Sequence, residues 1–147
     1  MQGYVHDEIA AFLGGVSGNA GLFGNAREVA EIFQLLLDKG VYQGRRYLMA
    51  ETCELFQNHT SKISRRALGF DKPDKKKPAL SPCSLEAPAQ VFGHTGFTGT
   101  CAWADPKNHL VFVFISNRIY PRPFDHKALM KLDIRPRIQQ IMYQALM

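Results

Sequence analysis

The feature of this sequence that most restricts its fold is a turn signal between two apolar runs. The turn signal spans residues 105–108, Asp-Pro-Lys-Asn, and these residue types favour tight turns. The runs are residues 100–104 and 109–116, and the second is apolar on both faces, as expected for a buried strand. A third strand signal, residues 91–94, lies just upstream. Together these segments predict an antiparallel meander.

Helical signals flank the meander. Asn25 is a favourable N-cap, and Glu28 three residues later can complete a capping box. Apolar residues then recur at helical spacing as far as Leu37, and Gly40 is predicted to take the left-handed C′ position that stops the helix. Weaker signals predict a turn at residues 41–48, a helix at 50–56 and a strand at 67–70.

A last helix is predicted near the carboxyl end, with Pro136 in its first turn. Its predicted core-facing side contains only apolar residues, namely Ile134, Ile138, Ile141, Met142, Ala145 and Leu146. The prediction is therefore one α+β domain over residues 1–147, in which an antiparallel sheet of three to four strands packs with about three helices. Residues 72–90 contain four prolines and no periodicity, which predicts a flexible loop.

Composition excludes several classes of protein. Hydrophobic residues make up 46% and charged residues 21%, the balance of a soluble globular domain, and no apolar run approaches the ~20 residues of a membrane span. Residues 1–7 show no targeting signal. Three cysteines outside any CxxC spacing predict neither a disulfide framework nor a metal site, and no cofactor motif is present. The net charge of +5 includes four lysines within residues 72–77, but no aromatic residues alternate with them, so no nucleic-acid partner is expected.

The chemically most unusual segment is residues 93–100, Gly-His-Thr-Gly-Phe-Thr-Gly-Thr. Its glycines allow a ligand to approach the backbone closely, its threonine hydroxyls can orient that ligand, and its histidine can exchange a proton near neutral pH. The same pattern also suits a strand with a bulge and a surface histidine, so residues alone leave both interpretations open.

This segment resembles the third motif of the serine β-lactamase and penicillin-binding-protein family. That motif is Lys-Thr-Gly, and His-Thr-Gly is a common variant in the class C and esterase-like branch. Residues 14–23, residues 103–106, residues 110–117 and the last helix resemble further segments of that branch in the same order. The resemblance covers nearly the whole chain and implies a partial β-lactamase/penicillin-binding-protein-like fold.

The resemblance also implies roles for particular residues. His94 would stand in the place of the motif lysine, Thr95 would line the same pocket, and Gly96 would let substrate lie against the strand. The Phe97 amide would be one of two oxyanion-hole donors. These four are the candidate catalytic residues. Thr98 is a candidate substrate-binding residue, as are His6 and Asp7, because a similar Val-His-Asp stretch precedes the glycine-rich segment in relatives.

The chain also departs from the family pattern. Family members carry a nucleophile in Ser-x-x-Lys, but no serine of this sequence has a lysine three residues later. The letters Ser17-Gly18-Asn19 fit the second motif, but they lie in the glycine-rich segment and are interpreted as chance. The expectation is therefore a carboxy-terminal fragment of a periplasmic or extracellular hydrolase, inactive alone. The alternative is a non-catalytic binding module for a carboxylate-bearing peptide or glycan.

The resemblance further implies partners. In the family fold, the strand at residues 109–116 pairs with strands from the amino-terminal part of the protein. We therefore expect that missing part to bind this chain, and we expect the exposed strand otherwise to pair with a second copy.

Overall fold

The computed structural model describes residues 3–58, 61–120 and 127–146. Its centre is a three-stranded antiparallel sheet in the order β3-β4-β5, formed by β3 (Phe92–Thr95), β4 (Cys101–Asp105) and β5 (Leu110–Phe114). These are the three predicted strands, each one or two residues from its predicted bounds. The predicted turn joins β4 to β5, since Asp105 Oδ1 accepts hydrogen bonds from the Lys107 and Asn108 amides. The predicted meander is confirmed.

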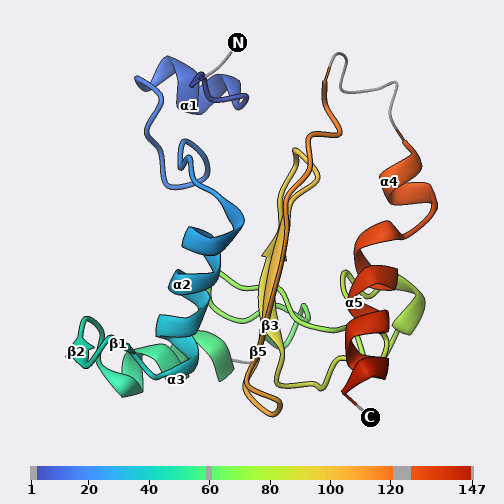
Figure 1. Cartoon of the computed structure of the whole chain (residues 1–147). Helices are drawn as coiled ribbons and strands as arrows, with labels where there is room; N and C mark the ends of the chain where they lie inside the picture. The colour runs from blue at the N-terminus through green and yellow to red at the C-terminus, as the bar shows by residue number, and fades with distance from the viewer. Residues whose placement is uncertain (1–2, 59–60, 121–126, 147) are drawn as a thin grey trace.

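Two helices cover opposite faces of the sheet, as Figure 1 shows: α2 (Ala26–Leu37) on one and α5 (Ile134–Ala145) on the other. Strand alternation divides the core accordingly. Phe92, Ala104 and Val111 pack with α2, whereas Trp103, Cys101 and Phe112 pack on the α5 side. The architecture is α+β, as predicted, with a helix on each side of one small sheet.

Helix α2 has the predicted start. Asn25 and Glu28 form both hydrogen bonds of the capping box. At its carboxyl end, the Gly40 amide donates to the Leu35 carbonyl and the Lys39 amide to Leu36, a Schellman arrangement. The left-handed C′ residue is therefore Lys39 (φ 52°). Gly40 (φ 84°) occupies the next position, C″, instead of the predicted C′.

The remaining elements are short. They are α1 (Glu8–Phe12), the hairpin strands β1 (Val41–Tyr42) and β2 (Arg45–Arg46), α3 (Ala50–Asn58), the 3-10 turn η1 (Pro78–Leu80) and α4 (Ala128–Lys131). The predicted helix at 50–56 is confirmed as α3. The predicted strand at 67–70 is wrong: these residues form a turn, and only Asp71 bridges to Gly93 of β3.

The orientation predicted for the last helix is wrong. Its buried residues are Arg135, Gln139 and Tyr143, whereas Ile138 and Ile141 are exposed. Each buried polar side chain has a partner: Arg135 donates to the Thr100 carbonyl, Gln139 accepts from the Ser84 amide, and Tyr143 donates to Asp105. Because these hydrogen bonds offset the cost of burial, the polar stripe faces the sheet.

Residues 72–90, predicted to be a flexible loop, form an irregular segment that is anchored in the core. Its only regular element is η1, but Cys83, Ser84 and Ala87 are almost fully buried. Two of its lysines bind main-chain carbonyls, Lys72 at Gln57 and Gln90 and Lys75 at Leu85. The prolines thus prevent regular structure here without preventing close packing.

Burial of the thiols predicts a fall in stability at alkaline pH. Burial raises the pKa of Cys83 and of Cys101 from 9.0 to about 11. The folded chain therefore holds these protons more tightly than the unfolded chain, so each thiol's contribution is complete below pH 9 and is lost as the pH rises towards 11. At about pH 10 the expected loss is about 1.4 kcal/mol per thiol.

Urea unfolding at about pH 8 and about pH 10 measures this loss, and the ionisation of tyrosines near pH 10 is shared by the comparison variant. The matched comparison is the Cys83→Ala/Cys101→Ala variant. The cavities left by the two substitutions lower stability equally at both pH values. The loss of unfolding free energy between about pH 8 and about pH 10 should therefore be nearly ~3 kcal/mol smaller in the variant than in the unchanged chain. An equal fall in both proteins would contradict the prediction.

Candidate functional site

The site begins with the sheet edge at β3. The two main-chain hydrogen bonds between Gly93 and Asp71 lie on the side of β3 away from β4. Since main-chain groups alternate along a strand, those of Thr95 point to the same outer edge. Asp71 covers this edge at Gly93 alone. Within the described residues, the Thr95 amide has no main-chain partner and its carbonyl oxygen is contacted by the His94 ring, so no other strand covers this end of β3.

A glycine is needed inside β3 for packing. A Cβ at Gly93 would collide with the Ala102 carbonyl oxygen and would lie 2.7 Å from the Trp103 ring. Trp103 lies across from Gly93 in the register and is only 1% exposed, so its indole occupies the space beside the glycine. This packing fixes the position of the strand that carries His94 and Thr95.

Beyond β3, residues 96–99 turn back towards β4 beside a groove of about 1280 Å³. The His6 ring is stacked on the Phe97 ring with their centroids 5.5 Å apart, and the Arg118 guanidinium lies 4.7 Å from the same ring centroid. The groove collects residues from the amino-terminal segment, the 96–99 turn and the chain after β5, including Tyr4, His6, Asp7, Asn19, Phe23, Gly96, Phe97, Thr98 and Tyr120.

Five of the seven predicted site residues line this groove: His6, Asp7, Gly96, Phe97 and Thr98. The other two, His94 and Thr95, do not line it. Asp7 caps α1, because its Oδ1 accepts from the Ala10 amide at 2.8 Å. That hydrogen bond is the main reason that the pKa of Asp7 is lowered. Asp7 therefore has a structural role at the groove wall.

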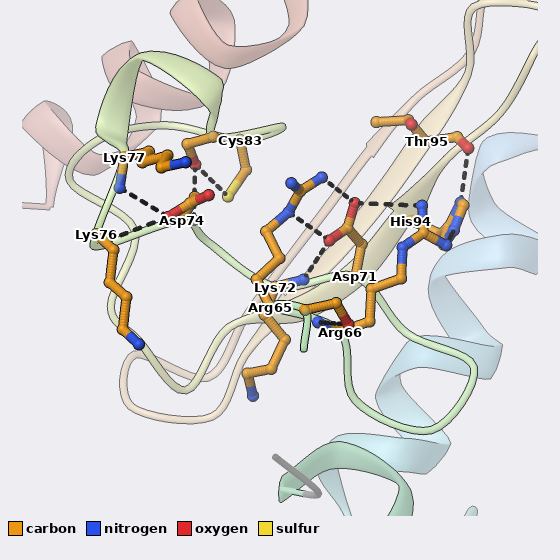
Figure 2. Close-up of polar contacts among 12 residues, drawn as sticks. Arg65, Arg66, Asp71, Lys72, Asp74, Lys76, Lys77, Cys83, His94 and Thr95 are labelled. Carbon is orange, nitrogen blue, oxygen red and sulfur yellow. Dashed lines mark hydrogen bonds and ion pairs between the residues drawn. The ribbon is translucent and has the colours of Figure 1, made fainter. Parts of the chain in front are cut away.

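His94 lies exposed at the end of β3 and is surrounded by charged side chains (Figure 2). Its Nε2 is 3.1 Å from Nη1 of Arg66, and its Nδ1 is 2.7 Å from the Thr95 carbonyl oxygen. Arg65 binds both oxygens of Asp71, at 2.7 and 2.8 Å, and this pairing raises the pKa of Arg65. The environment of His94 is thus a basic cluster rather than the groove.

Sequence reasoning missed several residues of this region. Arg66 is separated from His94 by 28 residues, and Arg118 reaches Phe97 from the segment that follows β5. No local pattern marks either arginine, because both contacts depend on how distant segments meet. Asn19 lines the groove, and its side chain accepts a hydrogen bond from the Ser17 hydroxyl.

Three further observations concern metal ligands, membrane-spanning helices and cysteines. Within the described residues, no group of three His, Cys, Asp or Glu side chains is arranged to hold a metal ion. No described helix combines the length and apolar character needed to cross a bilayer. All three cysteines are buried as free thiols.

Comparison with known proteins places this fold and strand end in a family. A family model described as Beta-lactamase matches residues 2–134. A Putative D-alanyl-D-alanine carboxypeptidase of Escherichia coli (strain K12) is 38% identical over 119 residues, which are 80% of this chain and 27% of that protein. The protein of the same name from Salmonella enteritidis PT4 (strain P125109) is 35% identical over the same shares.

The chain thus spans about a quarter of the length of these curated relatives. The resemblance carried by the His-Thr-Gly strand is confirmed, and so is the α+β arrangement of that strand in a sheet packed with helices. This chain belongs to the Beta-lactamase family of penicillin-binding-protein-like serine hydrolases.

Proposed function

We propose that this chain is the carboxy-terminal portion of a D-alanyl-D-alanine carboxypeptidase-like serine hydrolase and supplies the third-motif wall of its active site. The observation that carries the proposal is the open edge of β3 at Thr95, which continues into the Phe97 turn beside the groove. An extended peptide can add to such an edge through main-chain hydrogen bonds. The names of the relatives suggest a peptide ending in D-alanine.

The Phe97 amide is the group best placed to stabilise charge in this reaction. No hydrogen bond within the described part of the chain uses it. In acyl transfer, a free main-chain N–H at the end of a strand can donate to the oxygen that becomes negative in the tetrahedral intermediate. The Phe97 ring contacts both the His6 ring and the Arg118 guanidinium.

The chemistry needs groups that this sequence lacks. Acyl transfer in the family uses a serine nucleophile deprotonated by the lysine of Ser-x-x-Lys, and the 147 residues contain no such pair. The nucleophile must therefore come from the amino-terminal portion of the same enzyme, which the proposal makes the main partner of this chain. The intact enzyme would act in the periplasm or outside the cell, where peptidoglycan peptides are found.

The first prediction from this proposal is that the chain alone is inactive. Incubation with a chromogenic cephalosporin, a p-nitrophenyl ester or an acyl-D-alanyl-D-alanine peptide should give no turnover above buffer, since nucleophile and base are both missing. Turnover that disappears in Ser17→Ala would contradict this expectation, because Ser17 would then be the nucleophile.

The positive test supplies the missing groups in trans. A separately produced segment of a family member, carrying Ser-x-x-Lys and Tyr-x-Asn, is mixed with this chain. Restored D-alanine release should be lost in Phe97→Pro, which has no N–H, and retained in Phe97→Ala, which keeps the amide. Peptide binding without any restored turnover would favour the alternative, a non-catalytic binding module.

A further inference from the structure

We propose that Arg66, which lies outside the motif, carries the positive charge at the third-motif position, while the His94 ring is held with a proton on Nδ1 and its Nε2 lone pair towards Arg66. Arg66 then acts as the anchor for a carboxylate of the ligand, and His94 positions it. The tautomer follows from this chain's own contacts. The role toward a ligand rests on the proposed function.

The tautomer follows from what each partner of His94 can do. The Thr95 carbonyl oxygen, 2.7 Å from Nδ1, can only accept a hydrogen bond, so Nδ1 must carry a proton. The Arg66 guanidinium, 3.1 Å from Nε2, can only donate, so Nε2 must present its lone pair. An imidazolium would place an N–H against the guanidinium, and two donors would then face each other. The two contacts therefore specify one tautomer of the ring, with the proton on Nδ1.

The charge of the cluster is provided by its arginines. Asp71 is almost fully buried and is bound through both oxygens by Arg65, which neutralises its charge. Arg66 lies 3.9 Å from Asp71, too far for a hydrogen bond. Two guanidinium groups and one carboxylate leave one net positive charge. Because the Arg66 side chain is 54% exposed, that charge faces solvent.

Arg66 is held in place from both sides. The Asp71 backbone is joined to Gly93 by two hydrogen bonds, which tie the 65–71 segment to β3. At the other end, His94 accepts from Nη1 of Arg66. A guanidinium has five N–H donors in a fixed plane, so several remain for an incoming carboxylate. The arrangement thus offers a fixed, always-charged anchor beside the open edge of β3.

The proposal is tested by nitrogen NMR of the histidine rings in the full chain. Long-range proton–nitrogen correlation at about pH 8.5, where histidines of ordinary pKa are neutral, distinguishes a protonated Nδ1 from a protonated Nε2. The His94→Gln variant identifies the signals. We expect His94 to show a protonated Nδ1 and a bare Nε2.

Variants separate positioning from general folding effects. In Arg66→Gln, the side-chain amide can donate or accept, so the nitrogen signals of His94 should move towards those of a mixture of tautomers. In Arg66→Lys, a donor remains, so the nitrogen signals of His94 should be largely retained. Arg45→Gln is the matched control, since Arg45 lies in the separate β1–β2 hairpin. A protonated Nε2 in the unchanged chain, or a pattern indifferent to Arg66→Gln, would overturn the proposal.

The anchoring role is tested with acetate as the probe and acetamide as its uncharged counterpart. Acetate should shift the Arg66 and His94 signals saturably, acetamide should not, and Arg66→Gln should weaken acetate binding about tenfold or more, as for loss of a charge-assisted hydrogen bond. Equal responses to both probes would overturn this role. Neither arm depends on turnover, so a failure of the proposed function would appear only in the hydrolysis assays.

Discussion

Replacing Gly93 with alanine should lower the free energy of unfolding by about 3 kcal/mol or more, the upper range for overpacking a core. The added Cβ would meet the Ala102 carbonyl oxygen and the Trp103 ring, and neither can rotate away. Moving β3 outward would instead stretch its hydrogen bonds with β4 and press Gly93 against Asp71. The strand therefore has no inexpensive way to relax.

Gly96→Ala is the matched control for this variant. Its Cβ would collide mainly with the Thr100 hydroxyl, the end of a side chain that can change rotamer, so the loss should stay below about 1 kcal/mol. Urea unfolding followed by fluorescence measures both, because Trp103 is the only tryptophan and is buried. Similar stabilities for the two alanine variants would show that the packing around Gly93 is not tight.

The second large effect concerns the opposite edge of the sheet. We propose that the chain forms a dimer through β5. Within the described residues, β5 pairs with β4 alone. The main-chain N–H and C=O of Gly93 point away from β4, and the strand register carries this alternation across the sheet. The main-chain groups of Val111 and Val113 therefore point to the unpaired side of β5. An unpaired edge without charged residues invites another strand, and two copies related by a two-fold axis satisfy each other.

Val113→Lys should convert this dimer to a monomer. A lysine can lay its methylenes along the sheet and keep its ammonium group in water, and two such charges would face each other across the dimer edge. Val113→Thr keeps a branched, uncharged side chain and should leave the dimer intact. Sedimentation equilibrium at micromolar concentration distinguishes the 16.5 kDa monomer from a pair.

The control for folding is circular dichroism, which should give similar spectra for the Lys and Thr variants. A soluble 16.5 kDa monomer for the unchanged chain would contradict self-association. The amino-terminal portion of the proposed enzyme should compete for the same edge. Its addition is therefore expected to dissociate the dimer, since both partners use the main-chain groups of β5.

Local patterns predicted the elements whose signals are strong over short distances. The capping residues Asn25 and Glu28, the turn at residues 105–108 and the three apolar strands all appear close to where they were expected. In each case the determining interactions join residues within a few positions of each other. The family motif around His94 was recognisable for the same reason, because its residues are contiguous.

The tertiary structure alone decided which face of α5 is buried and what surrounds His94. Apolar spacing favoured the Ile138 side, but the hydrogen bonds that the Ser84 amide donates to Gln139 and that Tyr143 donates to Asp105 make the polar side the buried one. Those partners lie 55 and 38 residues away, so their effect is invisible in a helical pattern.

The candidate site divides along the same line. Contiguity in the sequence was enough to single out residues 93–100 as a candidate site, and five of the seven predicted residues do share one groove. Only the folded chain brings Arg66 to His94 and Arg118 to Phe97. The physical reason is that charge and stacking act through space, and the segments that meet here are set side by side by the packing of the whole sheet.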